Sequence, residues 1–324
     1  MSIDRAVIEE AARAIEESPS MALACHVGPD GDALGSMLAL GIAASGRGKD
    51  VVAGFGSPHL VPPSLAFLPT ELLVTPDDFP EAPPLMVVLD VGSPQRLGEL
   101  AANAGKAGKV IVVDHHVTNE GFGDIAVVDP EAGASGELVY DILVSLGWEL
   151  TPDVAMCLHT ALVTDTGRFS YSNTTPRTLR IAADLVAAGA EPSVIGRHIY
   201  EEAPFGYLKA AALALGRARL DAERKVISTV VTFEDLAENE IDWEDTENLI
   251  DLLRLALEAD TAVLVKAHED GRVKVSLRSR GDTDVGGLAA AMGGGGHRLA
   301  AGFTTEGDPE AVRERVVSVV EEHR

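Results

Sequence analysis

The first half of the chain alternates short apolar runs with longer segments in which apolar residues recur at helical spacing. The apolar runs resemble buried strands and occupy residues 21–25, 51–53, 85–89, 109–113 and 125–128. The segments with helical spacing occupy residues 4–17, 33–46, 135–146, 152–163 and 178–188. Strands that alternate with helices predict an α/β domain with a mainly parallel sheet flanked by helices.

The remaining residues predict a helical connector and then a second, smaller α/β domain. The connector, residues 191–216, has helical spacing and no strand candidate. Strand candidates follow at 226–232, 262–267 and 272–279, and helix candidates at about 246–258 and 309–322. Asp270 and Gly271 separate the last two strands, and Asp-Gly between alternating apolar residues is a strong hairpin signal. We therefore divide the chain into domains 1–190 and 217–324, because a chain of 324 residues exceeds what one hydrophobic core usually supports.

Composition narrows the class of protein. Hydrophobic residues make up 46% of the chain, yet no apolar run reaches the roughly 18 residues of a membrane-spanning helix. Residues 1–17 form a charged amphipathic stretch without the apolar core of a signal peptide. Two cysteines, Cys25 and Cys157, are too few for a disulfide framework and lack the spacing of a metal site. We expect a cytoplasmic protein that does not associate with membranes.

The charge balance limits the partners. The chain has 51 acidic and 26 basic residues and a formal net charge of −25. Proteins that bind long nucleic acid need a basic groove, because neutralising phosphates supplies much of their affinity. Long DNA or RNA is therefore a poor partner, whereas a small anionic substrate could be held by metal ions and a few local arginines.

Polar side chains follow four of the apolar stretches in the first domain. They are His26, Asp30 and Asp32; then Asp90; then Asp114, His115 and His116; and finally Asp165. In an open α/β sheet, ligands bind beyond the carboxyl ends of the strands. We therefore expect all four clusters to lie at one edge of one sheet.

This collection of side chains indicates a metal centre. A single aspartate at a strand end is usually a turn or cap residue, but several carboxylates gathered at one edge repel each other unless a cation compensates them. Carboxylates and imidazoles without thiolates favour Mn²⁺, with Mg²⁺ or Co²⁺ as alternatives. The donors are too many for one tetrahedral zinc and enough for two ions that share a carboxylate and an activated water.

Six motifs in sequence resemble those of a known family. Four resemble the DHH phosphoesterase superfamily: HVGPDGDALGS (26–36), VVLDVGS (87–93), VVDHH (112–116) and VTDTGRF (163–169). Two resemble its C-terminal DHHA1 domain: SLRS (276–279) and GGGGHRLAAGF (293–303). Within the superfamily the chain looks most similar to the oligoribonuclease (nanoRNase)/pAp-phosphatase group.

The resemblance implies a role for each motif residue. One ion would be held by His26, Asp30 and Asp90, and the other by Asp32, Asp90, His115 and Asp165. Asp90 would bridge the ions, His116 would help to protonate the leaving group, and Asp114 would fix a histidine tautomer. The substrate-binding residues would come from the second domain and are Arg278, Ser279, Gly295, Gly296 and His297. The glycines also permit a close backbone approach to an anion.

The implied activity is hydrolysis of short nucleotide substrates by in-line attack of a metal-bridging hydroxide. Candidate substrates are RNAs of a few residues, 3′-phosphoadenosine 5′-phosphate (pAp), and cyclic di-AMP with its linear product pApA. One alternative is a family-II inorganic pyrophosphatase, although its Arg-Lys-Lys signature is absent. A RecJ-like single-strand exonuclease would need a basic channel, and a catalytically silent nucleotide-binding module would have lost metal ligands. Relatives are often homodimers, and the sequence leaves the oligomeric state open.

Overall fold

The computed structural model of the chain describes residues 4–246 and 248–324. Residues 1–3 of the predicted first domain and residue 247 of the helix predicted at 246–258 lie outside the described residues. The chain divides into two compact units between Glu202 and Ala203, within the segment that we interpreted as a connector. Each unit has its own sheet and its own hydrophobic core.

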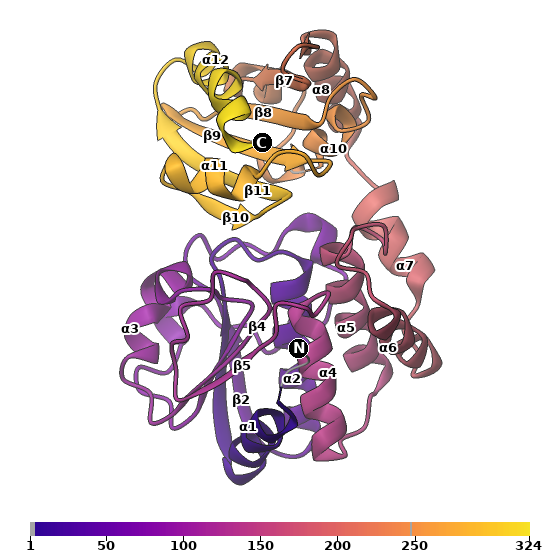
Figure 1. Cartoon of the computed structure of the whole chain (residues 1–324). Coiled ribbons are helices and arrows are strands. Elements are labelled where there is room, and N and C mark those ends of the chain that lie inside the picture. The colour runs from indigo at the N-terminus through magenta and orange to yellow at the C-terminus, as the bar shows by residue number, and fades with distance from the viewer. Residues whose placement is uncertain (1–3, 247) are drawn as a thin grey trace. The chain divides into compact units, whose positions relative to one another are not determined.

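The described part of the first unit is built on a five-stranded parallel sheet with the order β2-β1-β3-β4-β5 (Figure 1). The strands are β1 (Ser20–Cys25), β2 (Asp50–Gly54), β3 (Met86–Leu89), β4 (Val110–Asp114) and β5 (Ile125–Val128). Because side chains alternate along a strand, Leu23 and Val87 enter one core and Ala22 and Val88 enter another on the opposite face. Both faces are buried, which explains why these strands have continuous apolar sequences. The predicted parallel sheet is confirmed.

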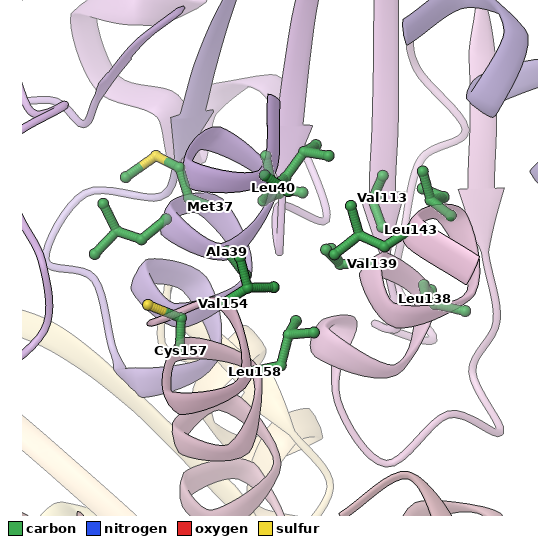
Figure 2. Packing of buried hydrophobic residues seen from close by; sticks show 14 of the residues in the cluster. Met37, Ala39, Leu40, Val113, Leu138, Val139, Leu143, Val154, Cys157 and Leu158 are labelled. Atoms are coloured by element: carbon green, nitrogen blue, oxygen red, sulfur yellow. The ribbon is translucent and has the colours of Figure 1, made fainter. Parts of the chain in front are cut away.

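Helices cover both faces of this sheet. The helices of the unit are α1 (Arg5–Glu17), α2 (Gly31–Gly46), α3 (Ala101–Ala104), α4 (Ser135–Leu146), α5 (Pro152–Asp165), α6 (Pro176–Ala187) and α7 (Pro192–Gly196). Figure 2 shows α2, α4 and α5 packed around shared apolar side chains, including Leu40, Val139 and Leu158. Helix α2 is buried along nearly its whole length, and accordingly its sequence is apolar on all sides.

The second unit contains a mixed sheet, which in the described residues has six strands in the order β10-β11-β9-β8-β7-β6. The strands are β6 (Arg219–Asp221), β7 (Val226–Val231), β8 (Thr261–Ala267), β9 (Arg272–Ser279), β10 (Gly295–His297) and β11 (Ala300–Glu306). Only β7 and β8 pair in parallel among these strands. The hairpin predicted at Asp270-Gly271 is confirmed, because β8 and β9 are antiparallel and Gly271 has a φ of +85°.

Helices pack on both faces of the second sheet. They are α8 (Phe205–Gly216), α9 (Phe233–Glu238), α10 (Leu249–Leu253), α11 (Val285–Ala291) and α12 (Pro309–Val319). Val263 and Leu277 belong to the core under α11 and α12, whereas Ala262 and Leu264 belong to the core under α8 and α10. Among the described residues, none of the helices is both long enough and apolar enough to span a membrane.

The second unit also departs from the sequence predictions. The helix predicted at 246–258 is limited to α10, which ends at Leu253, and turns follow in which Leu255 and Leu257 are exposed. Helices α9 and α11 and strands β6, β10 and β11 were not predicted. These elements are short, and β11 is rich in small residues, so hydrophobic periodicity gives them little signal.

Candidate metal centre

Three of the four polar clusters lie where parallel strands end. His26 directly follows β1, Asp90 directly follows β3, and Asp114 is the last residue of β4. These three strands are neighbours in the sheet, so their carboxyl ends lie side by side. The remaining ligand candidates stay close by because His115 and His116 follow β4 directly, and the loop after His26 leads into α2.

The start of α2 positions two aspartates. Asp30 is the N-cap, and its side chain accepts hydrogen bonds from the backbone N–H groups of Asp32 and Ala33. Asp32 lies in the first turn and is 1% exposed. Carboxylates are favoured at a helix N-terminus because the N–H groups there have no partner within the helix.

Asp165 reaches the cluster from the helix that we predicted at 152–163. It is the last residue of α5 and does not follow a strand, unlike the residues at the ends of β1, β3 and β4. Two glycines of α2 allow α5 to approach. A Cβ at Gly31 would lie 2.5 Å from the Thr164 side chain, and a Cβ at Gly35 would lie 2.4 Å from the Cys157 carbonyl oxygen. Close packing of α5 against α2 therefore brings Asp165 to the other donors.

The first group of donors surrounds the Nε2 atom of His26. This atom lies 3.8 Å from Asp30 Oδ2 and 3.5 Å from Asp90 Oδ2. The other ring nitrogen, Nδ1, lies 3.1 Å from the Val27 carbonyl oxygen, which can only accept a hydrogen bond. Nδ1 therefore carries the proton, and in the neutral ring the lone pair of Nε2 points at the two carboxylates.

The second group surrounds the Nε2 atom of His115. It lies 3.6 Å from Asp32 Oδ2, 3.6 Å from Asp90 Oδ1 and 3.5 Å from Asp165 Oδ2. Its Nδ1 lies 3.2 Å from the Ala132 carbonyl oxygen, so the same tautomer argument applies. The two groups share Asp90, whose two oxygens face different histidines.

Asp90 occupies a strained backbone position. Its φ is +57°, which side-chain-bearing residues rarely adopt, and the residue is 2% exposed. Its N–H donates to the Val113 carbonyl oxygen and so continues the ladder between β3 and β4. Such strain persists only where the surroundings impose it, and it is common at functional sites.

A third group orients His116. Its Nδ1 lies 2.7 Å from Asp114 Oδ1, and Asn119 Nδ2 donates to Asp114 Oδ2 at 2.6 Å. Asp114 is fully buried, whereas the His116 side chain is 18% exposed. No role was predicted for Asn119 from the sequence, because it stands in a polar loop without a motif that distinguishes it.

Together, burial and the charges of the cluster raise the pKa values of two of its histidines and two of its aspartates. Burial opposes protonation of His26 and His115, but the surrounding aspartates outweigh it and raise the pKa of each to about 10. Burial, with the charges of Asp30 and Asp90, raises the pKa of Asp165 to about 6 although His115 opposes this. Burial likewise raises the pKa of Asp32. Several acids that share one site without a compensating charge behave in this way.

The spacing of the donors fits divalent ions. The nitrogen-to-oxygen distances of 3.5–3.8 Å are too long for hydrogen bonds. Two donors bound to one ion at about 2.1 Å lie roughly 3.0–3.5 Å apart, so small movements would satisfy an ion in each group. Sets of three and of four donors that share a carboxylate match a pair of hard or borderline cations.

The substrate-binding residues predicted in the second unit fall on two faces of its sheet. Arg278 pairs with Ala300, and Ala300 pairs with His297, so the three side chains lie in one cross-strand row. Ser279 is next along β9 and points to the opposite face. It is 2% exposed and donates to Asp260 Oδ2 at 3.1 Å. The structure therefore does not bring Ser279 together with Arg278 and His297.

The backbone conformation explains why a glycine stands at position 296. Gly296 has a φ of +136°, and a Cβ there would lie 2.6 Å from the Ala300 carbonyl oxygen. Gly295 has open space around it. A glycine run is often a flexible loop. Here Gly295 and Gly296 belong to a strand, β10, which pairs with β11.

Comparisons with known proteins agree with this arrangement. The DHH family, N-terminal domain, matches residues 20–162, and the DHHA1 domain matches residues 223–322. The bifunctional oligoribonuclease and PAP phosphatase NrnA of Thermus thermophilus is 34% identical over 303 residues, which are 93% of this chain and 89% of that protein. The chain belongs to the DHH family.

Two further comparisons cover both units. The protein of the same name from Bacillus subtilis is 28% identical and covers 94% of this chain and 95% of its own length. The solved structure of an exopolyphosphatase-related protein from Bacteroides fragilis has a TM-score of 0.89 and 24% identity, with 98% and 97% of the two chains covered. At that identity the likeness concerns the fold alone. The resemblance and the α/β fold class predicted from the sequence are confirmed.

Proposed function

We propose that the chain is a two-metal phosphoesterase that hydrolyses short nucleotide substrates. The observation that carries the proposal is the orientation of Asp90, with Oδ2 at 3.5 Å from His26 Nε2 and Oδ1 at 3.6 Å from His115 Nε2. A carboxylate that faces two donor groups suits a bridge between two ions, as in phosphatases and nucleases. The names of the Thermus and Bacillus relatives support oligoribonucleotides and pAp as the substrate class.

The donor sets assign the ligands. We propose that His26, Asp30 and Asp90 hold one ion and that Asp32, Asp90, His115 and Asp165 hold the other. When bound, the two ions would polarise the phosphate and lower the pKa of water. Oxygen and imidazole donors without a thiolate support Mn²⁺, with Mg²⁺ or Co²⁺ as alternatives.

His116 has the geometry of a proton donor to the leaving group. Asp114 accepts a hydrogen bond from Nδ1–H of His116, which orients the ring and leaves Nε2 on the far side. Burial lowers the pKa of His116, but the hydrogen bond to Asp114 and the charge of Asp90 outweigh it and raise the pKa. A ring protonated on both nitrogens would keep its bond to Asp114 while Nε2 donates to the departing oxygen.

The second unit supplies candidates for binding the nucleotide. Arg278 and His297 flank Ala300 on one face of the sheet, where a guanidinium and an imidazole would bind an anion. Gly295 and Gly296 leave the neighbouring backbone accessible. We therefore propose a catalytic domain at about 1–190 and a substrate-binding domain at 217–324, joined through 191–216.

A comparison of substrates tests this function. Purified protein with Mn²⁺ would be offered pAp, a dinucleotide, a five-residue RNA, cyclic di-AMP and pyrophosphate, each with an EDTA control. We expect turnover of at least one nucleotide substrate that EDTA abolishes. Hydrolysis of pyrophosphate alone would overturn the nucleotide assignment, and nucleotide binding without hydrolysis would instead indicate a silent binding module.

Two further properties belong to this proposal. A cytoplasmic location is supported by Cys25 and Cys157, which are both buried and free, as expected in a reducing compartment. A homodimer stays a prediction from the family resemblance. Light scattering on the same sample would measure the oligomeric state.

A further inference from the structure

Helix α4 begins without a capping side chain of its own. The preceding residue, Ala134, has no polar side chain that could accept the first N–H groups of the helix. Instead, Ser135 N–H donates to Asp32 Oδ2 at 2.7 Å, and Gly136 N–H donates to Asp32 Oδ1 at 3.0 Å. An aspartate more than a hundred residues earlier in the chain therefore caps α4, and that aspartate belongs to the second donor group.

The side chain of Ser135 contacts a second carboxylate of the same centre. Its hydroxyl donates to Asp90 Oδ1 at 2.9 Å, and Ser135 is completely buried. One residue thus binds Asp32 through its backbone and Asp90 through its side chain. The partial positive charge at the start of α4 also favours the ionised form of both carboxylates.

These bonds restrict how the two carboxylates can turn. Asp90 Oδ1 lies on the His115 side and Oδ2 on the His26 side, and rotation about its last side-chain bond would disturb both contacts. A hydrogen bond from Ser135 to Oδ1 opposes that rotation. Asp32 is fixed still more firmly, because Ser36 Oγ also donates to its Oδ1 at 3.0 Å.

We propose that Ser135 is a positioning residue of the metal centre, which holds the shared carboxylate of Asp90 and the carboxylate of Asp32 in the orientation that two ions require. This inference rests on the proposed function. Ser135 is not one of the proposed ligands, and its hydroxyl donates to one of them, Asp90. Outer partners of this kind orient metal ligands, and their loss typically lowers metal affinity or activity by about 10- to 100-fold.

Titration with Mn²⁺ tests the inference without a measurement of activity. Two Mn²⁺ ions that share a carboxylate give an exchange-coupled electron paramagnetic resonance spectrum, whereas isolated ions give a six-line spectrum. We expect the coupled spectrum for the unchanged protein. Ser135→Ala loses the hydroxyl bond to Asp90 and keeps the backbone bond to Asp32, and its coupled spectrum should appear only at about 10- to 100-fold more Mn²⁺. Ser135→Thr, which retains the hydroxyl, should recover most of the loss.

A matched control separates positioning from general destabilisation. Ser228 is also buried, and its hydroxyl accepts a hydrogen bond from Arg313 within the second unit, whereas the donor groups belong to the first. Ser228→Ala should therefore give the unchanged Mn²⁺ titration. Thermal melting of all variants in EDTA would show that each is folded at the temperature of the titration.

The outcomes distinguish the inference from the function on which it rests. If the unchanged protein shows no coupled pair at any Mn²⁺ concentration, the two-metal proposal fails. If it shows the pair and folded Ser135→Ala shows it at the same concentration, only the positioning role of Ser135 is overturned. A shift in Ser135→Ala that Ser135→Thr reverses supports the role.

Discussion

Single side chains at this site do more than supply donor atoms. Asp90 combines a left-handed backbone, complete burial and two oxygens that face different histidines. His116 is oriented by Asp114, which is in turn held by Asn119. Each of these contacts fixes the orientation of a side chain. The proposed chemistry depends on the orientation of these side chains as much as on their residue types.

Removal of the shared carboxylate should have the largest effect. We expect the turnover rate of Asp90→Ala to fall by more than roughly 100-fold at any Mn²⁺ concentration. Loss of a residue that only orients a metal ligand already lowers activity by about 10- to 100-fold. Steady-state rates over a range of Mn²⁺ would measure this. Asp184→Asn, an exposed acid bonded to Tyr140, should leave the rate unchanged. Substantial activity of Asp90→Ala would contradict its role as the bridge.

Loss of Asn119 should impair turnover more than binding. Without its amide, Asp114 keeps the contact with His116 but loses the donor that fixes its other oxygen. We expect kcat of Asn119→Ala to fall by about 10- to 100-fold while KM changes little. Asn103→Ala removes a comparable amide bond, to the Pro80 carbonyl oxygen, and should leave both constants unchanged. An equal loss in the two variants would indicate destabilisation rather than positioning.

Among the secondary-structure elements, the contact between α2 and α5 decides whether the second donor group exists. The strands place His26, Asp90 and Asp114 by themselves, but Asp165 depends on how closely two helices pack. Gly31 and Gly35 lie one turn apart on the same side of α2 and permit that approach. Displacement of α5 would move Asp165 away from His115.

A methyl group in this contact should be costly. In Gly35→Ala the new Cβ would lie 2.4 Å from a backbone oxygen, and overpacking of this kind lowers the free energy of unfolding by about 1–3 kcal/mol. Helix propensity offsets up to about 1 kcal/mol of that loss. Urea denaturation in EDTA would measure the change, and Mn²⁺ titration should show weaker binding.

Gly46→Ala is the matched control, since Gly46 is also in α2 but has no atom within 4 Å of the added Cβ. It should leave Mn²⁺ binding unchanged and the stability equal or higher. Equal stability of the two variants would show that α2 and α5 have room to move apart.

For the molecule as a whole, two properties matter: the separate cores of its units and its acidic excess. The donor groups around His26 and His115 lie in the first unit, and the second unit has cores of its own. The net charge of −25 opposes polyanions at long range, while the proposed ions act only locally.

Metal removal should therefore destabilise one unit. An ion that binds only the folded state stabilises it by about 2.7 kcal/mol at a concentration 100 times its Kd. We expect Mn²⁺ to raise the temperature of the calorimetric unfolding transition of residues 1–202 and EDTA to lower it again. The transition temperature of residues 203–324 should change little. Hydrogen exchange would assign the transitions, and equal protection of both units by Mn²⁺ would contradict the prediction.

The salt dependence of RNA binding should also be unusual. Proteins that bind long nucleic acid through a basic groove bind more tightly as salt is lowered. Here we expect a 30-residue RNA, measured by fluorescence anisotropy in Ca²⁺ without turnover, to bind no more tightly at low salt than at high salt. A steep gain in affinity at low salt would indicate a basic nucleic-acid surface.

The amino-acid sequence alone determined the fold class and most of the candidate centre, because the polar residues stand where buried parallel strands end and such ends meet at one sheet edge. That argument places His26, Asp90 and Asp114. Tertiary structure alone decided the rest. Asp165 arrives on a helix, Asn119 holds Asp114 from the loop after β4, and Ser135 acts through Asp90, which is distant in the sequence. Hydrophobic periodicity reports only on neighbours along the chain, whereas these contacts depend on how closely separate elements pack.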